Sequence, residues 1–246
     1  MIKANPSLGE LPGIGQINVA PSDRVDLPST AVSTGRNTDS GAEIFKYKVT
    51  TGKFEGQIFE YYRGQTLSGT EKWLNIDSYP PLNNKQIANF NELASYRQKQ
   101  AAAGTPVTDT RGNNGTVSLI EHNGIYYIGT NSENWAPSIS QDMDTWANNI
   151  GFTQRSRSVL NPLRHAEAHS LKQLHDAGSV PKQLELYVDR IACPDCLQDL
   201  PRLANKMGVV ELTIRLPDGR YSISTNGEPP NRSWIPEELN KINEGK

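Results

Sequence analysis

The residues best suited to chemistry lie between His165 and Cys196. A His-Ala-Glu triplet begins at His165, and a Cys-Pro-Asp-Cys stretch begins at Cys193. One imidazole and two thiolates suit Zn²⁺, and a catalytic zinc site typically takes three protein ligands and keeps a fourth position for water. The Glu167 carboxylate is then free to move a proton between water and a substrate. We therefore predict a Zn²⁺ site held by His165, Cys193 and Cys196, with Glu167 as the catalytic acid and base.

The pattern around these residues predicts the elements that must position them. Apolar residues at helical spacing indicate a helix over 163–177 that ends at Gly178, and a second helix over 194–207 that ends at Gly208. The alternation over 184–191 is typical of a strand. One helix would carry the histidine and the glutamate, and the start of the next would carry both cysteines. A helix amino terminus lowers a thiol pKa and so favours the thiolate that zinc binds.

Further elements flank this segment on both sides. A helix is expected over 84–103, followed by a hairpin of 116–121 and 125–129 joined at Asn123 and Gly124. Strands over 209–216 and 221–224 flank a Pro-Asp-Gly turn that is too short for a crossover, so we expect them to be antiparallel. Residues 130–162 between the hairpin and the metal segment are polar and predict a long loop.

The order of these elements suggests how the chain is divided. Residues 1–40 are rich in Gly, Pro, Ser and Asn and predict a linker or mobile lead. Residues 41–80 predict a β-rich amino-terminal extension, with strands around a turn at 50–52. The zinc domain is expected over 81–230, with a Pro-rich tail over 231–246. The fold class is α/β with a mixed sheet.

Composition narrows the class of protein further. The chain has 246 residues, of which 35% are hydrophobic. Its formal net charge is −2, so it has no global basic field that would gather nucleic acid. Both of its two cysteines lie in the metal motif, which excludes a disulfide scaffold. No apolar run approaches the length of a membrane span, and the first residues lack the layout of a cleaved signal peptide.

The pairing of H-x-E with a later C-x-x-C resembles the signature of the zinc nucleobase deaminases, with Ala192 where that signature has a proline. The chain is thus similar to the cytidine deaminase superfamily, which implies a three-layer α/β fold. The closing hairpin resembles the division of that fold that contains many bacterial polymorphic-toxin deaminases. Within that group, the run from Cys193 to Gly219 resembles the DNA cytosine deaminase toxins. This resemblance covers roughly residues 84–225, and residues 1–80 match no family.

The resemblance implies a zinc-dependent hydrolase that converts cytosine to uracil in nucleic acid. We expect single-stranded DNA as the substrate, because a chain with no excess positive charge has little to offset duplex unpairing. Duplex DNA, RNA, a free nucleotide and adenine stay open as alternatives. The resemblance further implies a toxin of interbacterial competition, with mutagenesis as its effect and an immunity protein as its partner. Such a toxin would be secreted by a specialised system and act in the recipient cytoplasm.

Substrate contacts are expected just before the metal helix. Three arginines could contact phosphates or be solvated, three aromatic rings could stack on a base or fill the core, and two polar residues could read the base. Asn161, followed by Pro162, also fits a helix cap. The residues in question are Arg155, Arg157, Arg164, Trp135, Trp146, Phe152, Asn161 and Ser158.

Three other uses of the motif are weighed against catalysis. A zinc protease places glutamate next to the first histidine, whereas here Ala166 intervenes. Thiol redox chemistry at the C-x-x-C would leave His165 and Glu167 without a role. A structural zinc site needs a fourth protein ligand, which His169 or Asp195 could supply, so a non-enzymatic interaction module also stays open.

Overall fold

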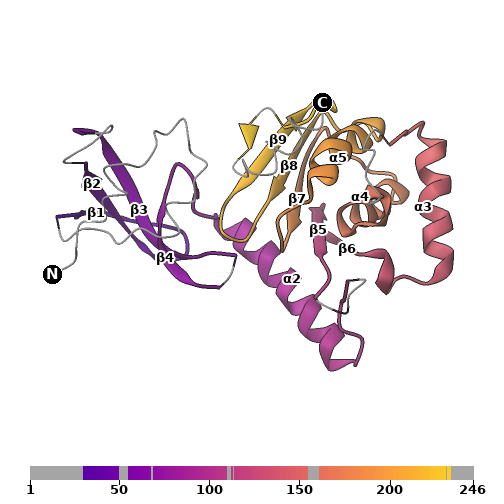
Figure 1. Cartoon of the computed structure of the whole chain (residues 1–246), viewed down its shortest axis with the longest axis horizontal. Coiled ribbons are helices and arrows are strands. Elements are labelled where there is room, and N and C mark those ends of the chain that lie inside the picture. The colour runs from indigo at the N-terminus through magenta and orange to yellow at the C-terminus, as the bar shows by residue number, and fades with distance from the viewer. Residues whose placement is uncertain are drawn as a thin grey trace. The chain divides into compact units, whose positions relative to one another are not determined.

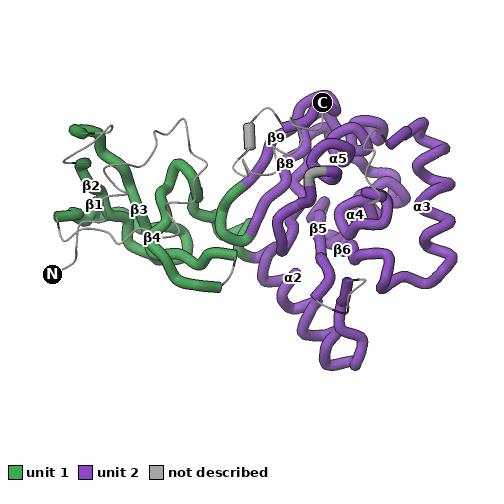
Figure 2. The backbone as a smooth tube through the Cα atoms, viewed as in Figure 1, with its two compact units in different colours: residues 1–87, 217–220, 234–236 green, residues 88–216, 221–233, 237–246 purple. Residues whose placement is uncertain are grey.

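A computed structural model of the protein describes residues 30–49, 55–67, 69–109, 112, 114–154, 161–230 and 232–233. They form a mixed α/β structure with two sheets and four α-helices (Figure 1). The chain divides into two compact units (Figure 2). Among the described residues, unit 1 comprises those up to Ile87 together with Pro217–Arg220, and unit 2 comprises Ala88–Leu216 and Tyr221–Ser233.

Unit 1 contains a four-stranded antiparallel sheet in the order β1-β2-β3-β4. Its β2–β3 pair matches the predicted hairpin, whereas β1 lies within the stretch predicted to be a linker. All but one residue of β1 are exposed, so the strand lacks the buried alternation by which a strand is recognised in sequence. The strands are β1 (Val32–Asn37), β2 (Glu43–Lys48), β3 (Ile58–Gln65) and β4 (Glu71–Asn75).

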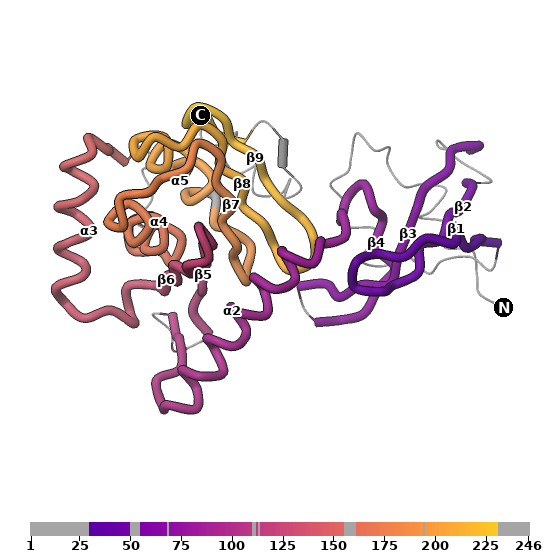
Figure 3. Tube along the Cα trace, turned by 180° about the vertical axis from the view of Figure 1, so that it is seen from behind, coloured from indigo at the N-terminus to yellow at the C-terminus, as the bar shows by residue number. Residues whose placement is uncertain are grey.

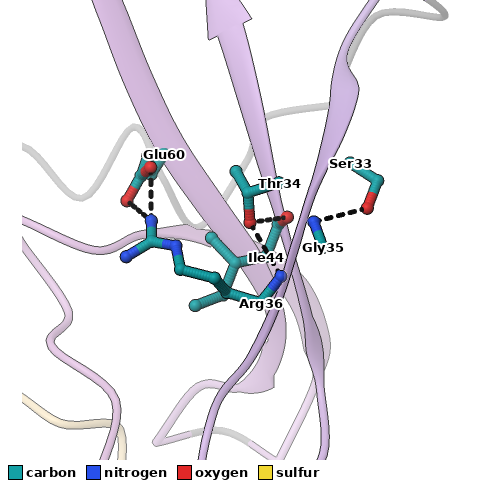
Figure 4. A network of polar contacts seen from close by, with 6 residues as sticks. All are labelled: Ser33, Thr34, Gly35, Arg36, Ile44 and Glu60. Carbon is teal, nitrogen blue, oxygen red and sulfur yellow. Dashed lines mark hydrogen bonds and ion pairs between the residues drawn. The ribbon is translucent and has the colours of Figure 1, made fainter.

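Polar side chains support β1 where its pairing with β2 is irregular. The register shifts between Ser33 and Asn37, and Gly35 there has a φ of 71°. Thr34 Oγ1 donates a hydrogen bond to the carbonyl of Ile44 at 2.8 Å. The guanidinium of Arg36 contacts both carboxylate oxygens of Glu60 across the sheet, as Figure 4 shows. These contacts hold the strand where its apolar burial is small.

Unit 1 also includes the tight turn at Pro217–Arg220. Gly219 has a φ of 90°, and a Cβ there would lie 2.1 Å from the carbonyl oxygen of Pro80. Beside it, Arg220 forms an ion pair with Asp218 at 2.8 Å and lies over the ring of Tyr79 at 5.3 Å. Only glycine therefore fits at the centre of this turn.

Unit 2 is built on a six-stranded mixed sheet in the order β10-β9-β8-β7-β5-β6. Only β7 and β8 are parallel, and α5 connects them. The antiparallel β8–β9 pair confirms the predicted closing hairpin. The strands are β5 (Val117–His122), β6 (Ile125–Thr130), β7 (Gln183–Val188), β8 (Glu211–Arg215), β9 (Tyr221–Thr225) and β10 (Arg232–Ser233).

The predicted Asn-Gly hairpin is confirmed in the β5–β6 connection. Asn123 and Gly124 have φ angles of 54° and 76°, so both central residues of the turn are left-handed. This is the backbone of the two-residue turns that match the twist of paired strands.

Helices pack on the two faces of this sheet (Figures 1 and 3). On one face, Leu93 of α2 packs with Val117, Leu119 and Tyr187. On the other face, α3, α4 and α5 cover a larger core that includes Leu171 and Leu197. The α-helices are α2 (Asn84–Ala102), α3 (Pro137–Asn149), α4 (Ala166–Asp176) and α5 (Pro194–Lys206).

Two helices differ from the prediction. Helix α3 occupies residues expected to be loop; only Met143, Trp146 and Ala147 of it are buried, a stripe too narrow to stand out in a polar segment. Helix α4 begins at Ala166, three residues later than predicted, because the preceding turn, η4 (Pro162–Arg164), is a separate 3₁₀ helix. Its end before Gly178, which has a φ of 75°, agrees with the prediction.

Candidate metal centre

The three predicted metal ligands come together in unit 2. Their ligand atoms all lie within 4.8 Å of one another. His165 Nδ1 is 2.8 Å from Cys196 Sγ and 3.5 Å from Cys193 Sγ, and the two sulfurs are 2.9 Å apart. A disulfide would need about 2.05 Å, so both cysteines are free thiols. Nitrogen Nδ1, rather than Nε2, is the imidazole atom that faces the sulfurs.

Two helix starts hold these ligands in place. His165 is the residue that caps α4, and its extended backbone (φ −92°, ψ 155°) turns the chain into the helix. Cys193 caps α5 in a similar conformation, and its Sγ accepts a hydrogen bond from the backbone N–H of Cys196 at 3.2 Å. The metal motif is therefore also a capping motif, because the sulfur satisfies an amide that the helix leaves unpaired.

The cluster fits a zinc ion by its donor types and its spacing. Zinc–ligand distances of about 2.0–2.3 Å place neighbouring tetrahedral ligand atoms about 3.3–3.8 Å apart, and each observed separation is within about 1 Å of that range. Among the described residues, neither His169 nor Asp195 joins the cluster. Instead, His169 Nδ1 accepts the backbone N–H of Thr130 at 3.3 Å. Three protein ligands leave one tetrahedral position for another molecule.

Glu167 is buried beside the cluster. Its side chain lies in the first turn of α4, and the residue is 3% exposed. Burial raises the pKa of Glu167 to about 7; the positive charge of His165 opposes this increase, and Cys193 and Asp189 add to it. A carboxyl group whose pKa is close to neutral can both take and give a proton, which is the property that general acid–base catalysis needs.

The three metal ligands also shift one another's pKa values. Hydrogen bonding to Cys196 lowers the pKa of Cys193 to about 5, against the effect of burial and with help from His165. Burial lowers the pKa of His165, but contact with Cys193 and the charge of Glu167 raise it to about 9 overall. Burial raises the pKa of Cys196 well above its usual value. One thiolate is thus available for a cation at neutral pH.

The polar residues before the metal helix have structural partners. Asn161 Oδ1 accepts a hydrogen bond from the backbone N–H of Leu163 at 3.0 Å, which is the expected capping role. Arg164 forms an ion pair with Asp144 at 2.6 Å and donates to the Ser140 carbonyl at 3.1 Å, so its guanidinium joins η4 to α3. Ser158, Arg155 and Arg157 lie outside the described residues.

The aromatic rings expected to stack on a base pack against the core. Trp146 and Phe152 are each 6% exposed within the larger core of unit 2, which favours core filling, the alternative to stacking on a base, for both rings. Trp135 is half-buried: its Nε1 donates to the Thr130 carbonyl at 2.7 Å and its ring meets His169 edge-on at 4.8 Å. Trp146 is buried because it lies on the inner side of α3, a helix that the sequence did not reveal.

The structure shows an ion pair between Arg97 and Asp189 that the sequence did not single out. Asp189 follows β7. Its carboxylate accepts hydrogen bonds from Arg97 Nε at 2.5 Å and from the backbone N–H of Val117 at 3.1 Å. Arg97 also donates to the carbonyl of Gly115. An acidic residue at the end of a buried strand is the one signal that could have drawn attention to Asp189, whereas Arg97 is remote in sequence.

No protein-family model matches the chain, and no match is found among curated proteins or solved structures. None of the described helices is long and apolar enough to cross a membrane.

Proposed function

We propose that the protein is a zinc-dependent hydrolase that deaminates cytosine to uracil in nucleic acid. The observation that carries this proposal is a three-ligand His-Cys-Cys cluster beside a buried carboxylate, Glu167, which is the second residue of the helix that His165 caps. A structural zinc module would need a fourth protein ligand, and none is found among the described residues. A second support is the resemblance of the H-x-E and C-x-x-C motifs to the zinc nucleobase deaminases, which implies a three-layer fold.

The proposed reaction assigns one role to each group of residues. His165, Cys193 and Cys196 would hold Zn²⁺, which as a Lewis acid makes water a nucleophile at neutral pH. Glu167 accepts a proton from the attacking water and delivers it to the ring nitrogen N3 of cytosine. The water oxygen adds to C4, and its remaining proton passes through Glu167 to the amino nitrogen. The bond from C4 to that nitrogen then breaks and ammonia leaves. Cytosine and water are thus converted to uracil and ammonia.

Single-stranded DNA is the proposed substrate. The charge of −2 gives little electrostatic help for opening a duplex, and unpairing a base costs a few kcal/mol. Trp146 and Phe152 no longer support a polymeric substrate, because both are buried. The preference for a polymer therefore rests on the resemblance to DNA cytosine deaminase toxins.

The same resemblance supports a role in interbacterial competition. The chain would be delivered by a specialised secretion system, mutate the DNA of a recipient cell from its cytoplasm, and be neutralised in the producer by an immunity protein. A protein encoded beside this chain that binds it without reducing its activity would contradict this role.

Purified protein incubated with single-stranded DNA, duplex DNA, RNA and free cytidine tests the proposal, with sequencing or chromatography to score C-to-U conversion. We expect conversion in single-stranded DNA by the wild type and none by Glu167→Gln, which keeps the shape of the side chain and removes its basic oxygen. Glu133→Gln, an exposed glutamate in η3 (Ser132–Asn134), is the matched control and should keep full activity.

Metal analysis of the same samples separates the alternatives. One zinc ion per chain in both the wild type and Glu167→Gln, with turnover in the wild type alone, supports the assignment. One zinc ion with no C-to-U conversion in any substrate refutes it and favours a structural zinc module.

A further inference from the structure

Helix α4 approaches the sheet unusually closely at Gly129 of β6. A Cβ at this position would lie 2.0 Å from the carbonyl oxygen of Ala166 and 2.7 Å from the backbone nitrogen of Ser170. Both contacts are to the backbone of α4, which cannot rotate away as a side chain can. Gly129 is not among the residues with positive φ, so a larger side chain is excluded by space alone.

Two buried hydroxyl groups occupy the same crossing. Ser118 Oγ of β5 donates to Ser170 Oγ at 3.0 Å, and Ser170 Oγ donates to the carbonyl oxygen of Glu167 at 3.0 Å. Both serines are fully buried. A buried hydroxyl is costly unless it is paired, so this chain of hydrogen bonds fixes where the first turn of α4 lies against β5.

We propose that Gly129, Ser118 and Ser170 are positioning residues that set the depth of the first turn of α4 and thereby place Glu167 relative to His165 and the two cysteines. Ala166, whose carbonyl faces Gly129, lies directly between His165 and Glu167 in the chain. Ser170 bonds the carbonyl of Glu167 itself. The close contact at Gly129 of β6 therefore sets the positions of both His165 and Glu167.

The separations set the size of the effect. Carbon–oxygen contacts to a real Cβ are essentially never under 3.0 Å, so a methyl group at residue 129 must move the first turn of α4 by about 1 Å. A misplacement of about 1 Å in a catalytic group can reduce turnover about a hundredfold. Loss of one buried hydrogen bond that only orients the turn corresponds to roughly a threefold to tenfold loss.

The experiment compares Gly129→Ala and Ser170→Ala with Leu174→Ala, a fully buried residue of the last turn of the same helix. Leu174→Ala weakens the packing of α4 without touching its first turn, so it is the control for general destabilisation. Each protein is loaded with Co²⁺, and its absorption spectrum is recorded well below its melting temperature. The kcat and KM on cytosine-containing single-stranded DNA are measured on the zinc forms.

For Gly129→Ala we expect one metal ion per chain, a shifted Co²⁺ spectrum and a kcat about a hundredfold below wild type with little change in KM. Ser170→Ala removes atoms and adds none, so it tests the idea even where Gly129→Ala does not fold; its kcat should fall by roughly threefold to tenfold. Leu174→Ala should melt earlier but keep the wild-type spectrum and kcat.

A wild-type spectrum and wild-type turnover in both Gly129→Ala and Ser170→Ala overturn the inference. So does a loss of kcat in Leu174→Ala as large as that in Gly129→Ala. The turnover readout rests on the proposed function, but the spectrum does not. A wild type that deaminates nothing refutes the proposed function alone, and the Co²⁺ spectra of Gly129→Ala and Leu174→Ala then decide whether this crossing positions the metal centre.

Discussion

Removing the guanidinium of Arg97 should destabilise unit 2 more than removing one partner of an exposed ion pair does. Arg97 and Asp189 are 2.5 Å apart, with side chains 26% and 16% exposed. Breaking a buried pair costs about 3–5 kcal/mol, and an exposed pair contributes about 0–1 kcal/mol. Solvent screening places this pair between the two limits, at about 2 kcal/mol. The hydrogen bond to the Gly115 carbonyl adds about 1 kcal/mol, so Arg97→Met should cost about 3 kcal/mol.

A double-mutant cycle measured by urea unfolding tests this value. Asp189→Asn keeps an oxygen for the N–H of Val117 and loses the charge, so it should cost about 2 kcal/mol. The double variant Arg97→Met with Asp189→Asn should cost less than the sum by about 1.5–2 kcal/mol, because the second change removes a charge that the first left unpaired. Lys99→Met in the same helix is the control. The Lys99 ammonium is 3.8 Å from Glu92 and its side chain is 70% exposed, so the change should stay within about 0.5 kcal/mol.

Two results would refute the reasoning. If Arg97→Met costs no more than Lys99→Met, the pair does not anchor α2 to the end of β7. If the double variant is additive, the two side chains do not interact, whatever their distance. In the expected case the Arg97 variant should also bind zinc more weakly, because Asp189 lies four residues before Cys193 and holds the start of the segment that carries it.

Three further predictions concern the metal centre and the core. Removing zinc with a chelator should lower the melting temperature, and Cys196→Ser should abolish the response to added zinc, because binding free energy is released only in the folded state; equal melting curves with and without the ion would contradict it. Trp146→Ala should lower the free energy of unfolding by about 3–5 kcal/mol, and Trp146→Phe by much less. Phenylalanine keeps most of the packing and removes an indole N–H that has no partner among the described residues. Calorimetry of both variants separates a core role from an exposed one. In metal-free protein, Glu167→Gln should stabilise the fold by about 3 kcal/mol near pH 8 and by little near pH 5. Burial raises the folded-state pKa from 4.5 to about 7, so stability is lost as the pH rises between these values, and a gain that does not grow between pH 5 and pH 8 would count against it.

The sequence by itself determined the elements and residues that depend on short spacings. The capping glycine after α4, the Asn-Gly turn of β5–β6 and the short β8–β9 connection each follow from neighbouring residues, and all agree with the structure. The His-x-Glu and Cys-x-x-Cys motifs are local in the same sense, because each belongs to one helix start. Their chemistry could therefore be predicted before their distance was known.

Only the tertiary structure decided which residues surround those motifs. The burial of Trp146 depends on α3, whose polar sequence gives a weak helical signal. The Arg97–Asp189 pair and the contact of Gly129 with Ala166 each join segments far apart in the chain. Contacts of this kind depend on how a helix and a strand cross, and no spacing within either segment encodes that crossing.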